Sequence, residues 1–224
     1  MKILVVSATE KEILPLKNKL KVNNATVCIM KYTVIKDFNV DFLVTGIGGV
    51  LTTYELTKAL MVKKYDMVIN AGIAGSFNKD IKIGVVAFVQ TDQFADLGVE
   101  VENSFYTMFE KGFIKKDQAP FKNALLENSY SNSFGLPKVS AITVNTTHGN
   151  EKSVRLFKNK FNADIETMEG AACAYVCLLE GIKFIQIRSI SNYVEIRNDA
   201  KWDVPLAIEN LNKELANIID KLDK

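Results

Sequence analysis

The sequence has little that could hold a metal ion or a disulfide framework. It contains one histidine, His148, and three cysteines, Cys28, Cys173 and Cys177, among 224 residues. A zinc site needs about four nitrogen or sulfur ligands, and an odd cysteine count does not close a disulfide set. Cys173 and Cys177 lie one helical turn apart in an apolar stretch, which is typical of small core residues. We therefore expect no metal site.

Long apolar runs and basic blocks are also missing. No apolar run reaches the roughly 18 residues that a membrane helix requires, and the N-terminal MKILVVSATEKE lacks the pattern of a signal peptide. The 28 basic residues are scattered and nearly balanced by 26 acidic ones, which argues against a nucleic-acid-binding surface. We expect a cytoplasmic protein with neither a nucleic-acid nor a membrane partner.

What the sequence does contain is a regular alternation of apolar strands and helical segments. Hydrophobic residues make up 48% of the chain, which shows no linker or repeat. Strands that are apolar on both faces and alternate with helices indicate a mostly parallel sheet that is covered on both sides. The predicted fold class is α/β, with residues 1–224 forming a single domain in which helices flank a mostly parallel, mixed central sheet.

The individual elements follow from hydrophobic periodicity and from helix start and stop signals. We expect strands at Ile3–Val6, Thr26–Met30, Val40–Thr45, Met67–Asn70, Val85–Thr91, Val139–Val144 and Phe184–Ile190. We expect helices at Thr9–Leu20, Val50–Lys64, Phe121–Asn128, Glu151–Lys160, Glu169–Glu180 and from Asp203 toward Leu222. The stretch from Asp92 to Pro120 is expected to be rich in loops.

Two glycine segments at expected strand ends raise the question of a dinucleotide site. GIGGVL at Gly46 lacks the third glycine of G-x-G-x-x-G, and AGIAGS at Gly72 leads into another strand without a crossover helix. The dinucleotide fingerprint requires both features, so we expect no cofactor. Ligands of parallel sheets bind beyond the carboxyl ends of the strands. Two glycine segments at that edge favour a cleft for a different small ligand.

Two carboxylates and a polar strand end belong to the same edge. Glu12 stands in the first turn of a helix, where it could also form a capping box with Thr9. Glu169 opens an almost wholly apolar helix, either as a cap or as a ligand-binding group. The last expected strand runs into Ser191 and Asn192. This combination suits a polyhydroxylated ligand and a base that activates water.

Several segments together resemble one known family over nearly the whole chain. MKILVVSATEKEILPL, VTGIGGVLTTYE, VINAGIAGSF, IETMEGAA and IRSISN stand in the order and spacing of the purine nucleoside phosphorylase and nucleosidase superfamily. The first segment resembles the start of methylthioadenosine/S-adenosylhomocysteine nucleosidases. The resemblance implies a nucleoside phosphorylase-like fold, N-glycosyl hydrolase activity and a purine nucleoside as substrate.

The resemblance also implies catalytic roles. Glu12 matches the base that activates the attacking water, and Arg188 matches an arginine close to that base. Met168 and Glu169 match the pair that holds the ribose. Phosphorylases of this superfamily bind phosphate with arginines near the first strand and after the second glycine loop. Here those places hold Glu12 and the arginine-free GIGGVLTTYE, which favours attack by water.

Further substrate contacts follow from the same resemblance. Ile73 stands where these nucleosidases usually carry serine, in a segment that lines the sugar. His148 and Gly149 stand where a base-stacking aromatic residue and a backbone contact to the purine are found. The other substrate-binding residues that we expect at this edge are Ile47, Gly48, Ala74, Gly75, Thr167 and Ser191.

Asn192 departs from the pattern of the adenine-releasing nucleosidases, which place an aspartate there to protonate N7 of adenine. An amide supplies no such proton, but it carries both a donor and an acceptor. Its oxygen can accept from a protonated N7 while its NH2 donates to a carbonyl at position 6. A mispaired buried polar group costs about 1–3 kcal/mol, so Asn192 favours a 6-oxopurine such as hypoxanthine.

Two more stretches, QFADLGVE and SNYVEIRNDAKWDVPLAIENL, resemble futalosine hydrolases. These enzymes release hypoxanthine from futalosine in the alternative menaquinone pathway. The 5′ side of futalosine carries an aromatic carboxylate, which Arg197 or Lys31 could bind and on which Trp202 or Phe105 could pack. Arg197 and Trp202 could equally be ordinary loop anchors. Members of the superfamily commonly complete this 5′ pocket from a neighbouring subunit, which implies a homodimer or a larger homo-oligomer.

Two alternatives stay open at this point. The chain could be a methylthioadenosine/S-adenosylhomocysteine nucleosidase or another purine nucleosidase. It could also be a nucleoside-binding domain without catalysis. Glu12 argues against the second alternative, because a pure binder has no need for a base beside the glycosidic bond.

Overall fold

The structure is a computed structural model that describes residues 1–20, 39–102, 104–128, 130–196 and 201–222. The expected strand Thr26–Met30 lies outside the described residues. The same holds for Cys28, Lys31 and Arg197.

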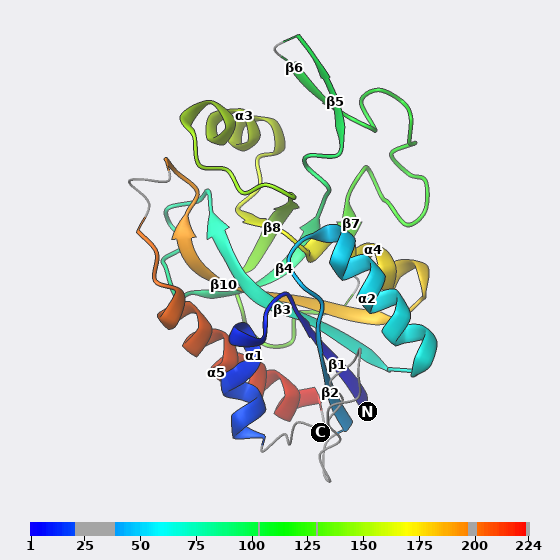
Figure 1. Ribbon diagram of the computed structural model, residues 1–224, viewed down its shortest axis with the longest axis vertical. Coiled ribbons are helices and arrows are strands. Elements are labelled where there is room, and N and C mark those ends of the chain that lie inside the picture. Colours follow the sequence, from blue (N-terminus) through cyan, green and yellow to red (C-terminus); the bar gives the residue numbers. More distant parts are fainter. Residues whose placement is uncertain (21–38, 103, 129, 197–200, 223–224) are drawn as a thin grey trace.

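A mixed eight-stranded sheet forms the centre of the molecule (Figure 1). The strand order is β10-β4-β8-β9-β3-β1-β2, and β7 pairs with β4. Strand β3 pairs with β10 as well as with β9, so β3, β10, β4, β8 and β9 close into a ring. The strands are β1 (Lys2–Ser7), β2 (Asn39–Val44), β3 (Met67–Ser76), β4 (Val86–Asp92), β7 (Leu126–Glu127), β8 (Lys138–Thr143), β9 (Ile165–Thr167) and β10 (Lys183–Tyr193).

Most neighbouring strands are parallel, as the sequence predicts. The pairs β1–β2, β1–β3, β3–β10, β4–β8 and β8–β9 are parallel, whereas β4–β10, β3–β9 and β4–β7 are antiparallel. The expected α/β class with a mixed sheet is therefore confirmed.

Helices cover the sheet on both sides. Helices α1 (Glu10–Lys19) and α5 (Val204–Leu222) pack on one face, whereas α2 (Gly49–Val62) and α4 (Gly170–Leu179) pack on the other (Figure 1). Alternate residues of β1 supply the two cores: Ile3 and Val5 face the first helix pair, and Leu4 and Val6 face the second. Helix α3 (Glu151–Phe161) lies beyond the end of the sheet. No helix in the described part of the chain is long and apolar enough to cross a membrane.

The expected helix at Phe121–Asn128 is wrong. Asn123 and Ala124 have positive φ angles of 48° and 66°, which an α-helix does not accommodate. Leu126 then pairs with Asp92 as part of β7. Pairing with a strand about 35 residues away, which no local pattern reports, overrides the helical spacing of this segment.

The structure contains further strands that the sequence did not indicate. The loop-rich stretch from Asp92 to Pro120 includes a hairpin of β5 (Gly98–Val101) and β6 (Ser104–Thr107). Strand β9 was not expected either. Strands β3 and β10 both run beyond their expected ends, so that AGIAGS is extended strand and not a loop. This extension carries Ile73 and Gly75 to the same edge as the end of β10.

Candidate active site

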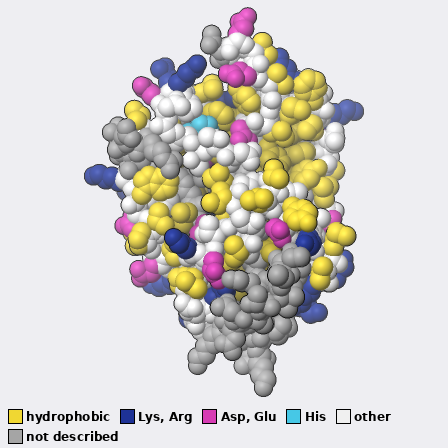
Figure 2. Space-filling view, in the orientation of Figure 1, with side chains coloured by type: hydrophobic (Ala, Val, Ile, Leu, Met, Phe, Trp, Pro, Cys, Tyr) yellow, Lys and Arg dark blue, Asp and Glu magenta, His cyan; other side chains and the backbone are white. Residues whose placement is uncertain are grey.

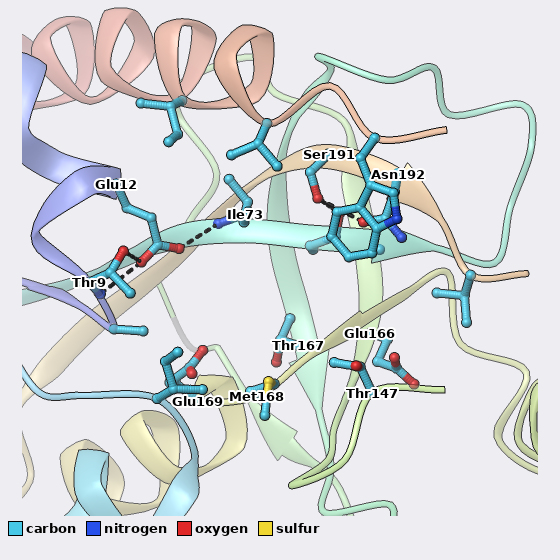
Figure 3. A pocket seen from close by; sticks show the side chains of 18 of the residues that line it. Thr9, Glu12, Ile73, Thr147, Glu166, Thr167, Met168, Glu169, Ser191 and Asn192 are labelled. Atoms are coloured by element: carbon cyan, nitrogen blue, oxygen red, sulfur yellow. Dashed lines mark hydrogen bonds between the residues drawn. The ribbon is translucent and has the colours of Figure 1, made fainter. Parts of the chain in front are cut away.

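A cavity of about 370 Å³ opens at the edge where β1, β3 and β10 end (Figure 3). It brings together most of the residues that the sequence singled out. Those that line it are Glu12, Ile47, Ile73, Ala74, Gly75, His148, Thr167, Met168, Glu169, Ser191 and Asn192. Residues far apart in the chain thus meet at one site, where the rule for open α/β sheets places ligands.

Glu12 is buried and held at a fixed orientation. Its Oε2 accepts three hydrogen bonds, from Ser7 Oγ at 3.0 Å, from the Thr9 N–H at 2.9 Å and from Thr9 Oγ1 at 2.9 Å. Its Oε1 accepts one, from the Ile73 N–H at 3.1 Å (Figure 3). The expected capping role is therefore present, but it occupies Oε2. Oε1 is the oxygen with acceptor capacity left for a water molecule.

Arg188 lies behind the cavity wall and does not line it. Its guanidinium donates to the Asn70 carbonyl at 3.2 Å and to the Asn70 side-chain oxygen, and it is 1% exposed. Gly72 separates Arg188 from Glu12: a Cβ at Gly72 would stand 3.0 Å from Glu12 Oε1 and 3.5 Å from Arg188 Nη1. The glycine of this strand is thus required for the close approach of the two side chains.

Glu169 occupies the N-cap position of α4 but does not cap that helix. Its Oε1 instead accepts a hydrogen bond from the Gly48 N–H at 2.9 Å. Burial raises the pKa of the Glu169 carboxyl above its ordinary value, and the charge of Arg188 and the Gly48 N–H oppose this shift. Of the two interpretations open from the sequence, cap or ligand-binding group, the first is therefore wrong for α4, and the side chain lines the cavity.

A buried polar network supports the start of α4. Asp92 accepts from Gln186 Nε2 and from Thr143 Oγ1, each at 2.9 Å, and Thr143 Oγ1 accepts from the Ala171 N–H at 2.8 Å. A Cβ at Gly170 would overlap Asp92 and Gln186. Burial raises the pKa of Asp92 to about 6, although the hydrogen bonds from Gln186 and Thr143 oppose the shift.

Asn192 and Ser191 form the opposite end of the cavity from Glu12 (Figure 3). Ser191 Oγ donates to Asn192 Oδ1 at 2.8 Å, and Asn192 Nδ2 donates to the Tyr193 carbonyl at 3.0 Å. These bonds use one acceptor site and one proton of the amide. The other proton of Nδ2 and the second lone pair of Oδ1 are the capacity that a ligand could use.

Three of the predicted residues that the structure describes do not line this cavity. Arg188 lies behind the wall, Gly48 acts through its N–H on Glu169, and Gly149 is not among the lining residues. Arg197 lies outside the described residues. Of the residues considered for the 5′ group, Trp202 lines the cavity, whereas Phe105 lies on β6 and stacks on Phe157 with ring centroids 5.9 Å apart.

Glu166 is a lining residue that sequence reasoning missed. It is 5% exposed, and its Oε1 accepts from the His148 N–H at 3.0 Å while Oε2 contacts His148 Nδ1. The signal was an acid beside an apolar residue, Ile165, two positions before Met168. It was overlooked because β9 was not expected. Lys11, Thr147, Glu195 and Val204 also line the cavity and were not singled out.

Known proteins resemble this chain over most of its length. The model of a family described as the phosphorylase superfamily matches residues 2–223. The chain is 26% identical to a futalosine hydrolase of Streptomyces coelicolor over 189 residues, covering 82% of this chain and 80% of that protein. It is 27% identical to a 5′-methylthioadenosine/S-adenosylhomocysteine nucleosidase of Bacillus pumilus over 210 residues, covering 91% and 90%.

Solved structures show the same fold. A futalosine hydrolase of Helicobacter pylori strain 26695 superposes with a TM-score of 0.81 at 19% identity, covering 99% of this chain and 98% of the other. A 5′-methylthioadenosine/S-adenosylhomocysteine nucleosidase of Neisseria meningitidis in complex with methylthio-immucillin-A superposes with a TM-score of 0.79 at 18% identity, covering 98% and 99%.

Proposed function

The chain belongs to the phosphorylase superfamily, and on this premise we propose that it hydrolyses the N-glycosidic bond of futalosine and releases hypoxanthine. The observation that carries the proposal is a cavity with a carboxylate oriented by hydrogen bonds, Glu12, at one end and an amide, Asn192, at the other. The first supports hydrolysis, and the second supports a 6-oxopurine. This reaction would make the protein an enzyme of the alternative menaquinone pathway.

The charge of the cavity favours water over phosphate as the attacking group. Among the described lining residues, the carboxyl groups of Glu12, Glu166, Glu169 and Glu195 face a single amine, that of Lys11. A phosphate dianion placed beside Glu12 would be repelled, whereas a neutral water molecule is not. The same carboxylate can take the proton that water loses on attack.

The proposed reaction assigns one task to each end of the cavity. Glu12 Oε1 takes a proton from water, the oxygen of that water bonds to C1′ of the ribose, and the bond from C1′ to the purine breaks. Glu169 accepts hydrogen bonds from the ribose hydroxyls and stabilises the positive charge that develops on the sugar. The purine leaves with the electron pair of the broken bond and takes up a proton from solvent.

Asn192 serves the leaving purine in this scheme. Its remaining Nδ2 proton faces the 6-oxo group, and its remaining Oδ1 lone pair accepts from N7 once N7 carries a proton. An aspartate at this place would present only acceptors to the 6-oxo oxygen. The amide therefore supports hypoxanthine over adenine as the leaving base.

The alternative substrate class is the 6-aminopurine nucleosides. Relatives named 5′-methylthioadenosine/S-adenosylhomocysteine nucleosidase are as similar to the chain as those named futalosine hydrolase. Identity of 26–27% does not separate the two activities. The distinction rests on the cavity, and above all on Asn192.

The test is release of free base from futalosine and from methylthioadenosine, each with and without added phosphate. We expect hypoxanthine from futalosine at a rate that does not depend on phosphate, and little adenine from methylthioadenosine. Efficient adenine release would contradict the 6-oxopurine assignment. A phosphate-dependent rate would contradict hydrolysis. Tight binding of futalosine without turnover would indicate a nucleoside-binding domain.

The proposed enzyme acts as a homodimer or a larger homo-oligomer. Helix α2 presents the exposed apolar side chains Val50, Tyr54, Met61 and Val62. Figure 2 shows hydrophobic side chains gathered on the side of the molecule that carries α2. Ile47, which is 56% exposed, both lines the cavity and adjoins this helix. A second copy packed on α2 would cover apolar surface and border the substrate site.

A further inference from the structure

Glu166 and Asn192 stand on either side of Gly75 across three neighbouring strands. Gly75 of β3 pairs with Glu166 of β9 and with Asn192 of β10. Residues in register on adjacent strands project to the same face of a sheet. A Cβ at Gly75 would lie 3.3 Å from Asn192 Nδ2, so the amide lies on the face toward which that Cβ would point. Because neighbouring strands are about 4.8 Å apart, the Cα atoms of Glu166 and Asn192 flank a gap of about 10 Å.

Gly75 between them adds no side chain of its own, so the side chains of Asn192 and Val194 can pack directly against its backbone. Both Glu166 and Asn192 line the cavity, and they face each other across it in Figure 3. A flat ring system bound in the cavity between these two side chains would therefore meet one polar group at each edge. A side chain at position 75 would displace these residues, because its Cβ would stand 2.8 Å from Val194 Cγ2.

The Glu166 carboxyl is held by one residue on the neighbouring loop. The backbone N–H and the ring nitrogen Nδ1 of His148 contact its two oxygens. An ionised carboxylate only accepts hydrogen bonds, so Nδ1 carries the proton and donates it. The His148 ring is in turn packed on Phe157 with ring centroids 3.9 Å apart. Each carboxylate oxygen retains acceptor capacity toward the cavity.

We propose that Glu166 reads position 1 of the purine, by accepting a hydrogen bond from the N1–H group of a 6-oxopurine. This inference rests on the proposed function and names a second specificity-determining residue opposite Asn192. With Asn192 at the N7 and 6-oxo corner, the next polar group along the base edge is N1. A 6-oxopurine carries a proton there, whereas a neutral 6-aminopurine presents a lone pair.

Glu166 thereby discriminates in the same direction as Asn192. The carboxylate attracts the N1–H of hypoxanthine and repels the N1 lone pair of adenine. His148 acts through Glu166 as a positioning residue, because it fixes the plane of the carboxylate that the base meets. This role is distinct from stacking of the His148 ring on the purine, which the family resemblance alone would assign.

The test compares wild-type protein with Glu166→Gln on futalosine and on its 6-amino analogue. The amide keeps the size of the side chain but can present NH2 to N1. We expect kcat/KM for futalosine to fall by roughly 5-fold to 150-fold, the effect of one mispaired buried polar group. The 6-amino analogue should be cleaved equally well or better. Equal losses on both substrates would reduce Glu166 to a structural residue and overturn the proposal.

Glu195→Gln is the matched control, since Glu195 also lines the cavity but forms a 3.1 Å ion pair with Lys79. This variant should leave the ratio of the two kcat/KM values, for futalosine and for its 6-amino analogue, unchanged. A futalosine derivative methylated at N1 gives a second measurement. For wild-type protein, methylation at N1 should lower kcat/KM by about the same factor as the change Glu166→Gln lowers it on futalosine. For Glu166→Gln, methylation should lower kcat/KM little further. Additive losses would overturn the proposed contact.

His148→Phe separates the positioning role from stacking. Phenylalanine keeps an aromatic ring but removes the Nδ1 donor to Glu166. The ratio of kcat/KM for futalosine to kcat/KM for its 6-amino analogue should fall, as it should in Glu166→Gln. The double variant Glu166→Gln/His148→Phe should show the same ratio as the single variants. A ratio unchanged from wild type would mean that His148 only stacks, which overturns its positioning role.

Calorimetry with free bases separates failure of this inference from failure of the proposed function. If wild-type protein does not cleave futalosine, the proposed function fails. The proposed contact between Glu166 and N1 is then tested by binding of free bases alone. Wild-type protein should bind hypoxanthine more tightly than 1-methylhypoxanthine, and Glu166→Gln should remove that difference. Equal affinities of wild-type protein for the two bases would contradict the N1 contact.

Discussion

Glu169 stands at the N-cap of α4, yet it accepts its hydrogen bond from the Gly48 N–H, 2.9 Å away and 121 residues earlier in the chain. Gly48 is itself the N-cap of α2, with a φ of 97°. One carboxylate therefore lies where two helices begin, and the positive ends of both helix dipoles favour its charge. The arrangement keeps a partly desolvated acid available to a ligand.

Replacing Glu12 tests the proposed base. Glu12→Gln preserves the size of the side chain but removes its ability to take a proton from water. We expect kcat to fall by about 10²–10⁴-fold, the usual contribution of a general base. The dissociation constant for hypoxanthine should change little, which calorimetry would measure. Near-normal turnover would remove Glu12 from the mechanism.

The raised pKa of Glu169 predicts a pH dependence of nucleoside binding. Protonation removes the negative charge and turns one acceptor oxygen into a donor, which weakens the bonds from the ribose hydroxyls. It sets in at a higher pH than for an ordinary glutamate. Futalosine affinity, measured as KM or as the dissociation constant with Glu12→Gln, should weaken as the pH falls through this range. In a Glu169→Gln background the affinity should be low and should no longer vary in this way. An unaltered pH profile in that background would contradict the assignment.

Gly72→Ala should impair catalysis by crowding the base. Its Cβ would stand 3.0 Å from Glu12 Oε1, and small-to-large changes in tight packing cost about 1–3 kcal/mol. We expect lower kcat together with a lower free energy of unfolding in urea. Gly49→Ala is the control, since its Cβ has 3.6 Å to Ala172 and an ordinary φ. Comparable losses in both variants would exclude a specific effect on Glu12.

Asp92 should make stability depend on pH. Its pKa is about 6 in the folded protein against 3.8 for an ordinary aspartate, so the folded state binds the proton more tightly between those values. The free energy of unfolding should therefore fall as pH rises from about 4 to about 6, by about 3 kcal/mol.

Asp92→Asn should remove this decrease of the free energy of unfolding between about pH 4 and about pH 6. Asp80→Asn, the same change at an exposed position, should retain it. Urea unfolding at several pH values measures both. A slope that persists in Asp92→Asn would assign the effect to other groups.

The apolar surface of α2 predicts the assembly state. Met61→Glu places a charge on a side chain that is 80% exposed in the single chain and should dissociate the proposed homo-oligomer. Light scattering should show the mass of one chain, 25.0 kDa. Leu14→Glu on α1, which is 42% exposed, is the matched control and should leave the mass unchanged. A single-chain mass for wild-type protein would contradict the oligomer.

Both ends of the candidate site could be anticipated from local sequence. Glu12 follows the first strand by a few residues, and Asn192 follows directly from the apolar part of the last, so both positions could be inferred from the rule that ligands bind at strand ends. The error at Phe121–Asn128 has the opposite origin. Leu126 pairs with Asp92 on a distant strand, and such pairing leaves no signal in a local window.

By itself, the sequence determined the alternation of buried strands and helices, and hence a mostly parallel sheet with Glu12, Glu169 and Asn192 at one edge. Hydrophobic periodicity carries that information, because each element must bury its own apolar face. Only the tertiary structure decided that Glu166 stands across Gly75 from Asn192. Strand register depends on pairing between three segments distant in the chain, and it is set when the whole sheet closes and not by any one of them.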